Sequence, residues 1–317
     1  MRRHWVAWAG LVACGPPPAP AHAPDGSALV AARPYELHVP PSYDAAHPAP
    51  LVLLLHGFTD SAKIQDAYFR VTEVADREGF LVALPDGTKD AGGNEFWNAD
   101  DACCDFGGTH VDDVAYLGAV LDDAERRYRI DPARVYVLGH SNGGFMAYRL
   151  ACELAPRIAA VAAHAGAPWL DASKCRPAAR VSLAAIYGDA DSLVHYGGGA
   201  LDDALLARLA KMIGTSLPPL VPGPRAYPSA HETVARWAKL DGCTGPLAPN
   251  ATLDLDTAVS GAETEVAAYG GCADGTAVEL WTMHGVDHMP DLAKRPAPPS
   301  FMEAVWAFFA AHPRAPR

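Results

Sequence analysis

The sequence predicts an α/β fold, with a mostly parallel central sheet covered by helices on both faces. Three observations support this prediction. Strand-like apolar segments alternate along the chain with segments of helical periodicity. Residues 51–55 are continuously apolar, which is typical of a strand buried in the middle of a parallel sheet. Half of the 317 residues are hydrophobic, which is enough to form the core of one large domain.

The order of the elements follows from local patterns. The helix after residues 51–55 carries its apolar residues on one face, and the next strand ends at a Pro-Asp-Gly turn at residues 85–87. A long polar loop covers residues 86–108, and Thr109 with Asp112 matches a capping box for the following helix. We expect strands at residues 34–40, 51–55, 80–84, 134–138, 158–163, 181–187, 263–269 and 277–283, and helices at residues 61–78, 109–128, 142–154, 231–240 and 300–311.

Residues 197–228 do not fit the alternation of strands and helices. They contain a short helical segment with apolar residues on one side, followed by a Pro-rich run. The apolar residues are Leu201, Leu205, Leu206, Leu209 and Met212. We favour a surface excursion that packs these side chains on the body of the domain. A flap over a pocket is the alternative.

The N-terminal residues have the pattern of an export signal. Arg2 and Arg3 precede an apolar run at residues 5–13, which is too short to cross a bilayer as a helix. Cys14 ends a segment that resembles a bacterial lipobox, in which the cysteine carries lipid; an ordinary signal peptide or a misassigned start is the alternative. We therefore expect an export signal at 1–14, a Pro-rich tether at 15–26 and a single domain at 27–317. The expected location is outside the cytoplasm, either lipid-anchored in a bacterial envelope or secreted.

The chain contains seven cysteines, and six remain when Cys14 is set aside. An even number of cysteines in an exported protein suggests disulfides. We expect one bridge between Cys243 and Cys272. The other predicted pairs join the vicinal Cys103 and Cys104 to Cys152 and Cys175. None of the spacings matches a metal site, so no metal or other cofactor is expected.

Acidic residues outnumber basic residues by 37 to 25, which gives a formal net charge of −12. Nucleic-acid binding requires clustered Lys and Arg against the phosphates, so nucleic acid is not an expected partner. Contact with a membrane is expected only through a lipid on Cys14. The sequence predicts no particular oligomeric state.

A candidate nucleophile lies at residues 139–143, which read Gly-His-Ser-Asn-Gly between a predicted strand and a predicted helix. This pattern at a strand-to-helix turn is typical of a nucleophile elbow, where glycines avoid clashes around a sharply turned serine. The N-terminus of the helix behind the serine favours a developing negative charge. Ser141 is therefore the predicted nucleophile, and an inert serine in a Gly-rich turn is the alternative.

A nucleophilic serine needs a base, and the base needs a carboxylate that orients it. In α/β-hydrolases these residues follow the serine at the ends of later strands, first the acid and then the histidine. The strand at residues 181–187 is followed by Asp189 and Asp191, and the strand at residues 277–283 is followed by His284 and His288. We favour Asp191 and His288, although spacing alone does not decide between the two aspartates.

The tetrahedral intermediate of ester hydrolysis also requires N–H donors for its oxyanion. One donor is expected from the backbone of Asn142, which follows the serine. The other is expected from the backbone of Phe58, in a loop where Gly57 permits close approach. The neighbouring His56 is expected to be a hydrogen-bonded structural residue.

Several separate motifs together resemble the polyhydroxybutyrate depolymerase and feruloyl esterase-like family of exported α/β-hydrolases. The motifs are His56-Gly57-Phe58, Pro85-Asp86-Gly87, Phe96-Trp97-Asn98, Cys103-Cys104-Asp105, Val111-Asp112-Asp113, residues 139–144, and Trp237 with Gly242-Cys243. The resemblance covers residues 33–310. It implies an α/β-hydrolase fold and a serine esterase that works through an acyl-enzyme. Ser141 matches the family's nucleophile, Asp191 its acid and His288 its base.

The chain departs from the family pattern at two places beside these residues. Tyr187 stands where the family's acid segment usually has its first histidine. Met289, followed by Pro290 and Asp291, replaces the Trp and Pro-Gly that often follow the base.

The resemblance implies an ester substrate, either a small ester or a polymer. Polyhydroxyalkanoate oligomers and feruloyl or acetyl esters are the candidates. Trp97 is expected to form one wall of the substrate pocket with its apolar neighbours Phe96 and Phe106, and His195 is expected to line the site; packing of the loop and polar surface are the alternatives. The alternative functions are a serine peptidase and a non-catalytic binding protein on the same fold.

Overall fold

The computed structural model describes residue 1 and residues 26–292 and 299–315. The predicted export signal with Cys14, and all but the last residue of the predicted tether, lie outside the described residues, apart from Met1. Within the described ranges, no helix combines the length and the apolar character that a membrane span requires.

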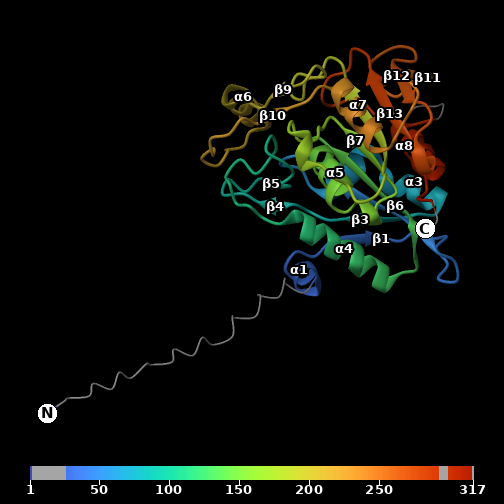
Figure 1. Cartoon of the computed structure of the whole chain (residues 1–317), viewed down its shortest axis with the longest axis horizontal. Helices are drawn as coiled ribbons and strands as arrows, with labels where there is room; N and C mark the ends of the chain where they lie inside the picture. Colours follow the sequence, from blue (N-terminus) through green and yellow to red (C-terminus); the bar gives the residue numbers. More distant parts are fainter. Residues whose placement is uncertain (2–25, 293–298, 316–317) are drawn as a thin grey trace.

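A nine-stranded sheet runs through the molecule (Figure 1). Its strands are β1 (Glu36–His38), β2 (Ala49–Leu55), β3 (Leu81–Leu84), β6 (Ile130–His140), β7 (Ala160–His164), β8 (Ser182–Gly188), β11 (Leu247–Leu253), β12 (Thr264–Tyr269) and β13 (Val278–Met283). They are ordered β1-β3-β2-β6-β7-β8-β13-β12-β11. The strands from β3 to β13 pair in parallel, and only the outer pairs are antiparallel. The predicted mostly parallel sheet is confirmed.

Helices cover both faces of this sheet. They are α1 (Gly26–Ala32), α2 (Ala62–Phe69), α3 (Val71–Glu78), α4 (Asp113–Arg127), α5 (Asn142–Glu153), α6 (Asp203–Ile213), α7 (Ala230–Leu240) and α8 (Phe301–Ala311). Because strand side chains alternate, β2 sends Leu51, Leu53 and Leu55 to one face and Val52 and Leu54 to the other. The first face packs on α4, α5 and α7, and the second packs on α2, α3 and α8.

The segment predicted as one helix at residues 61–78 forms two helices, α2 and α3. The break lies at Arg70, whose left-handed backbone (φ 61°) ends α2. Asp66 spans the break by accepting hydrogen bonds from the backbone N–H and the hydroxyl of Thr72, both at 2.8 Å. The apolar periodicity continues on both sides, so the sequence pattern gives no sign of the break.

The helix predicted to begin near residue 109 begins at Asp113 instead. Its N-cap is Asp112, whose side chain accepts a hydrogen bond of 2.9 Å from the backbone N–H of Ala115. Thr109 does not cap the helix, because its Oγ1 accepts the N–H of Val111, which lies before the helix, at 3.5 Å. The capping box predicted there is therefore wrong, and the cap lies three residues later.

The described residues contain three disulfides. The predicted Cys243–Cys272 bridge is present. The other two differ from the prediction: the vicinal cysteines bond to each other, as do Cys152 and Cys175. Cys103 contacts Asn142 at the N-terminal end of α5, whereas Cys152 lies ten residues further along that helix, about 15 Å away. A disulfide bridges Cα atoms less than about 7 Å apart, so the predicted pairs are out of reach.

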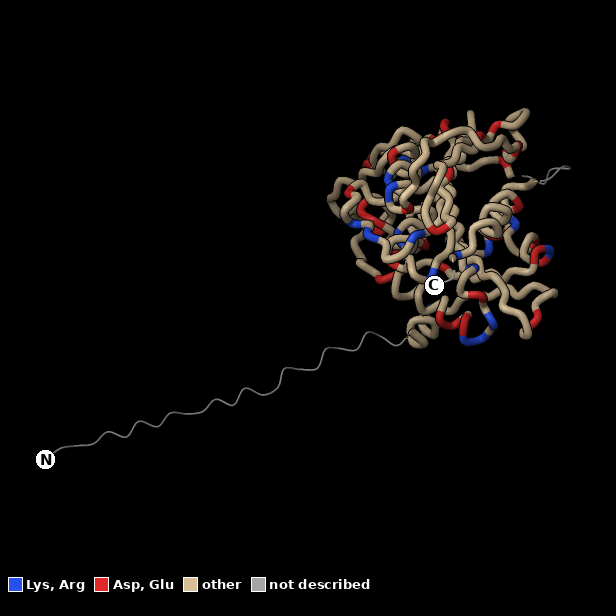
Figure 2. The backbone as a smooth tube through the Cα atoms, turned by 45° about the vertical axis from the view of Figure 1, so that its right-hand side comes forward, with Lys and Arg blue, Asp and Glu red and all other residues tan. Residues whose placement is uncertain are grey.

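Charged residues of both signs are distributed over the body of the molecule. In Figure 2 the blue Lys and Arg positions and the red Asp and Glu positions are both scattered over the body of the molecule. Many of them form surface ion pairs, such as Arg157 with Asp122 and Arg134 with Asp131. Charges of both signs therefore lie close together on the surface of the described residues.

Candidate active site

Ser141 lies on the sharp turn between β6 and α5. Its backbone has φ 53° and ψ −120°, an unusual combination for a residue with a side chain. Its N–H donates to the carbonyl of His164 at 2.8 Å, which fixes the turn on the neighbouring strand. A side chain at Gly139 would collide with the backbone of Gly143, and one at Gly143 would collide with that of Leu55. The two glycines of the motif are therefore required by close backbone approach.

The structure brings together the three residues that we predicted as nucleophile, base and acid. The Oγ atom of Ser141 lies 3.0 Å from Nε2 of His288. Nδ1 of His288 lies 2.8 Å from Oδ2 of Asp191, and both residues are largely buried. Because a carboxylate only accepts, Nδ1 carries the proton and Nε2 is left as the acceptor for the serine hydroxyl.

The second pair of candidates, Asp189 and His284, forms a separate contact on the surface. Oδ2 of Asp189 lies 2.9 Å from Nδ1 of His284, and Oδ1 accepts the backbone N–H of Gly285. This hydrogen bond, with Glu265 nearby, raises the pKa of the His284 imidazole above its usual value. The histidine that contacts Ser141 is therefore His288, which agrees with our choice.

The two expected oxyanion donors lie beside the serine. A side-chain carbon built on Gly57 would be 3.6 Å from Cβ of Ser141, so the loop that carries Phe58 passes close to the nucleophile. The backbone N–H groups of Phe58 and Asn142 have no acceptor among the described residues. An oxyanion placed between them has two unpaired donors to accept from.

The side chain of Asn142 ties the elbow to the long polar loop. Its Oδ1 accepts the backbone N–H of Trp97 at 2.7 Å, and its Nδ2 donates to the carbonyl of Trp97 at 2.9 Å. The same Nδ2 lies 3.6 Å from Sγ of Cys103. The residue after the nucleophile is thus held from its side chain as well as by α5. The sequence reasoning used only the backbone of Asn142 and gave no signal of this contact.

A layer of neutral histidines lies beneath the base. The ring of His140 is 5.2 Å from that of His288 and 5.0 Å from that of His164, and its Nε2 donates to the backbone carbonyl of His288 at 3.3 Å. Burial lowers the pKa of His140 well below its usual value and lowers the pKa of His164 to about 3. Both rings therefore stay uncharged at neutral pH and do not repel a protonated His288.

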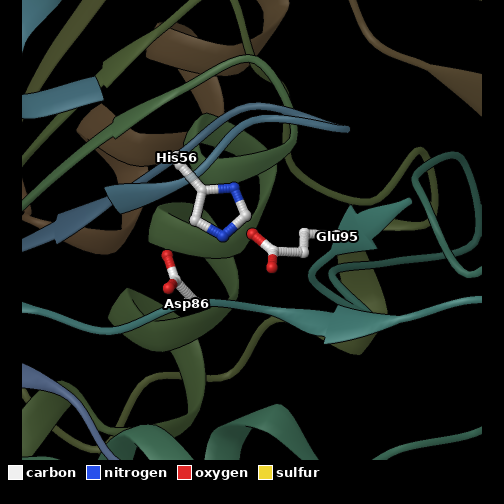
Figure 3. A group of neighbouring side chains, drawn as sticks. All are labelled: His56, Asp86 and Glu95. Atoms are coloured by element: carbon white, nitrogen blue, oxygen red, sulfur yellow. The ribbon is translucent and has the colours of Figure 1, made fainter. Parts of the chain in front are cut away.

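His56 is held on both ring nitrogens, as expected for a structural residue. Gly87 N–H donates to its Nε2 at 2.8 Å, so Nδ1 carries the proton and donates to the carbonyl of Gly57 at 2.7 Å. His56 lies near the carboxylates of Asp86 and Glu95, as Figure 3 shows. Since neither ring nitrogen keeps a free lone pair, this acidic cluster does not offer a histidine ligand for a metal.

A small apolar cavity of about 30 Å³ lies next to Ser141 and His288. Its other walls are Phe58, Phe106, Phe145, the Cys103–Cys104 disulfide, residues 193–194 and the leucines of the 201–209 segment. A larger polar groove of about 590 Å³ begins on the far side of Cys103 and Phe106, which line both spaces. The sequence periodicity placed these leucines on one side of a helical segment. Their contact with the serine depends on how α6 folds back.

Of the residues that we expected beside the substrate, Phe106 lines the cavity, whereas Phe96, Trp97 and His195 do not. Phe96 and Trp97 are fully buried and do not line the cavity, and Nε1 of Trp97 donates to the carbonyl of His56 at 3.1 Å. Their burial favours the alternative of loop packing over a role in substrate binding. His195 is exposed and its Nδ1 lies 3.0 Å from the carbonyl of Asp191, so it contacts the acid loop outside the cavity lining.

The segment at residues 197–228 carries α6 over the cavity. Leu205 and Leu206 are buried, and with Leu201 and Leu209 they face Ser141, as the flap alternative predicts. The interpretation that we favoured, packing on the body alone, is therefore incomplete. Met212 was expected on the same face but is 69% exposed, because it lies at the last turn of the helix.

Comparisons with known proteins place these features in a family context. A family model described as Esterase PHB depolymerase matches residues 33–195. Feruloyl esterase B of Piromyces equi is 28% identical over 253 residues, 78% of this chain and 41% of that protein. The bifunctional acetylxylan esterase/xylanase XynS20E of Neocallimastix patriciarum is 32% identical over 162 residues, 51% of this chain and 22% of that protein. The chain thus spans less than half of the length of these relatives.

Among solved structures, the acetyl xylan esterase from Aspergillus awamori superposes with a TM-score of 0.58 at 16% identity. The match covers 87% of this chain and 93% of that one. At this identity the similarity supports a shared fold and leaves the chemistry to be argued from the residues.

Proposed function

The chain belongs to the esterase family described as Esterase PHB depolymerase, and we propose that it hydrolyses carboxylic esters through an acyl-enzyme formed on Ser141. One observation carries this proposal: the hydrogen-bonded series from Ser141 through His288 to Asp191, beside two unpaired N–H donors. Serine nucleophile, imidazole base, orienting carboxylate and oxyanion donors are the set of groups that acyl transfer requires.

In the proposed first half-reaction, Ser141 Oγ attacks the ester carbonyl carbon while its proton passes to Nε2 of His288. Asp191 accepts the hydrogen bond from the Nδ1–H of His288 and stabilises the imidazolium. The carbonyl oxygen becomes an oxyanion and accepts from the N–H groups of Phe58 and Asn142. The C–O bond then breaks, and His288 returns the proton to the departing alkoxide, which leaves as the alcohol.

In the second half-reaction a water molecule takes the place of the alcohol. His288 accepts a proton from the water as its oxygen attacks the acyl carbon, and the oxyanion again accepts from the two backbone N–H groups. The acyl–serine bond breaks and the proton passes from His288 to Oγ of Ser141. The products are a carboxylic acid and the free enzyme.

The proposed reaction is tested with Ser141→Ala and p-nitrophenyl acetate. The variant should retain only the weak catalysis that oxyanion binding provides, roughly 10³–10⁴-fold above water, because the nucleophile is gone. A phenylmethylsulfonyl or phosphonate reagent should label the wild type on the peptide that contains Ser141 and should leave Ser141→Ala unlabelled. A label mapped to another residue, or an unchanged rate in the variant, contradicts the assignment.

We also propose that residues 27–317 form one catalytic domain that works outside the cytoplasm. The three disulfides support this location, because disulfides persist in oxidising compartments. An acyl chain on Cys14 would then hold the domain at a bacterial envelope. Expressed with its own N-terminus, the protein should partition into detergent, and Cys14→Ser should not. Recovery of unmodified protein in the soluble extracytoplasmic fraction would instead indicate a plainly secreted esterase.

A further inference from the structure

The space available beside Ser141 is limited by α6. The helix contributes Leu205, Leu206 and Leu209 to the wall of the cavity, and Leu201, two residues before the helix, contributes as well. Leu206 is 1% exposed, so its side chain is covered by the surrounding residues. In Figure 1, α6 lies together with β9 (Gly199–Ala200) and β10 (Ala226–Tyr227) at one end of the molecule.

The helix is fixed at its beginning by a buried arginine. Nε of Arg225 donates to the carbonyl of Leu201 at 2.7 Å, and its guanidinium pairs with Asp203 in the first turn. The same guanidinium donates to the carbonyl of Val221 at 3.1 Å, and the strands β9 and β10 pair beside it. These contacts therefore join the first turn of α6 to residues 221–227, at the end of the same segment.

The end of α6 is fixed independently. Nδ2 of Asn94 donates to the carbonyl of Ser216 at 2.8 Å, and the hydroxyl of Thr215 donates to Oδ1 of Asn94. Asn94 is itself buried and held by the carboxylate of Asp90 at 2.9 Å. Because both ends are anchored, the leucines cannot retreat without breaking buried hydrogen bonds.

The size of the cavity sets a limit on what it admits. A cavity needs roughly 10–15 Å³ to hold one water molecule, so about 30 Å³ holds about two. Among the candidate acyl groups, the two-carbon acetyl group suits so small a space best. The ring of a feruloyl group and the four-carbon chain of a hydroxybutyryl unit are larger.

The chemistry of the two spaces indicates which part of an ester enters each. Apart from Ser141 and His288, the cavity walls are apolar, so they suit a hydrocarbon and leave a hydroxyl without a partner. The groove beyond Cys103 and Phe106 contains charged side chains, among them Asp101 and Arg149, and suits a hydroxylated alcohol. The acyl group is therefore the part that α6 confines.

We infer that α6 restricts this site to esters of acetyl-sized acyl groups, and that Leu206 and Leu209 set the limit. The inference rests on the proposed esterase function. It selects among the ester classes that the family resemblance implies: acetyl esters fit without rearrangement, whereas feruloyl esters and hydroxybutyrate oligomers require displacement of α6.

The test compares p-nitrophenyl acetate, butyrate and octanoate, with methyl ferulate as an aromatic acyl ester, on the purified full chain. The wild type should show a kcat/KM for octanoate at least about tenfold below that for acetate, since forcing methylenes into a packed space is unfavourable. Leu206→Ala and Leu209→Ala should each raise the octanoate-to-acetate ratio about tenfold. Met212→Ala removes a side chain from the same helix outside the cavity and should leave the ratio unchanged.

Each other outcome has a definite meaning. Equal or rising kcat/KM from acetate to octanoate or to methyl ferulate in the wild type overturns the inference. So does a ratio unchanged by Leu209→Ala, a half-buried position that is less demanding for folding than Leu206. A folded wild type that hydrolyses none of these esters, acetate included, overturns the proposed function itself.

Discussion

Asp191 holds His288 through one carboxylate oxygen and is itself held through the other. Its Oδ2 lies 2.8 Å from Nδ1 of His288, while its Oδ1 accepts the backbone N–H groups of Leu193 and Val194, both at 2.8 Å. The carboxylate that orients the imidazole is therefore held in position by the backbone of its own loop. Asp287 links the two loops, because its Oδ1 accepts the N–H of both Ser192 and His288.

This arrangement predicts different effects for the two neighbouring aspartates. Asp191→Asn should lower kcat on p-nitrophenyl acetate on the order of 10⁴-fold, because an amide favours the wrong tautomer of His288. Asp189→Asn, whose partner His284 does not contact Ser141, should lower kcat less than about tenfold. The measurement is kcat at neutral pH, with the melting curve of each variant as a check on folding. A large loss in Asp189→Asn with a near-normal Asp191→Asn would reverse the assignment of the acid.

The contact between Asn142 and the backbone of Trp97 predicts a second effect near the oxyanion site. Asn142→Ala keeps its backbone N–H but leaves the buried N–H of Trp97 unpaired, at about 1–3 kcal/mol. The carbonyl of Trp97 then keeps only the longer hydrogen bond of 3.4 Å from the N–H of Cys104. We expect a lower Tm and a fall in kcat larger than the rise in KM, since the oxyanion is bound more strongly in the transition state than the substrate carbonyl.

Asn98→Ala is the matched control for this effect. Asn98 lies in the same loop and its Nδ2 donates to the carbonyl of Val111 at 2.8 Å, away from Ser141. It should lower Tm while leaving kcat within about twofold of the wild type. If Asn142→Ala behaves in the same way, its side chain stabilises the loop only and does not position the oxyanion donor.

The three disulfides allow stability and activity to be separated. Cys243 and Cys272 are 29 residues apart, and closing a loop of that length stabilises by about 3–4 kcal/mol in the chain-entropy relation. The vicinal bridge closes almost no loop and contributes about 1 kcal/mol by the same relation. The paired substitution Cys243→Ser with Cys272→Ser should therefore lower Tm by several degrees.

The matched pair Cys103→Ser with Cys104→Ser should have the opposite balance. Its effect on Tm should be smaller, whereas its effect on p-nitrophenyl acetate turnover should be larger, because this disulfide forms a wall of the cavity beside Ser141. Equal losses of Tm in the two paired variants, measured by the same melting assay, would show that loop length does not govern their contribution.

The candidate catalytic residues were predictable because they lie just after the ends of strands. Ser141, Asp191 and His288 come after β6, β8 and β13, and the carboxyl ends of parallel strands meet at one edge of the sheet. The glycines around Ser141 meet a local requirement of the backbone, and such a requirement is visible in the sequence itself. The continuously apolar strands were also predictable, because a strand that is buried on both faces of the sheet needs an apolar side chain at each position.

The features that escaped prediction depend on contacts between distant segments. Trp97 is aromatic and lies in the right loop, but its contact with His56 turns it into the core instead of the cavity. Cys103 lies beside Asn142 at the start of α5, away from Cys152 near the end of that helix, and no spacing rule contains this placement. Leu206 has the same helical periodicity whether α6 packs on the body or on the catalytic serine.

A last prediction concerns a buried carboxyl far from the site. Asp241 follows α7 and is 1% exposed, and its Oδ2 has no hydrogen-bond partner among the described side chains and backbone. Desolvation raises the pKa of its carboxyl to about 7. The folded protein therefore keeps a proton on Asp241 at a pH where the unfolded chain, with a pKa near 3.8, has lost it.

As pH rises from about 4 to 7, the folded state binds more protons at this position than the unfolded state, so the wild type loses stability. Asp241→Asn mimics the neutral carboxyl and has no proton to lose. Its Tm should therefore match the wild type near pH 4 and exceed it by a few degrees above pH 7, with the difference growing between these values. Asp122→Asn, at an exposed carboxylate paired with Arg157, should give no such growing difference. Melting curves of the three proteins across this pH range would contradict the prediction if the Asp241→Asn difference stayed constant or shrank with rising pH.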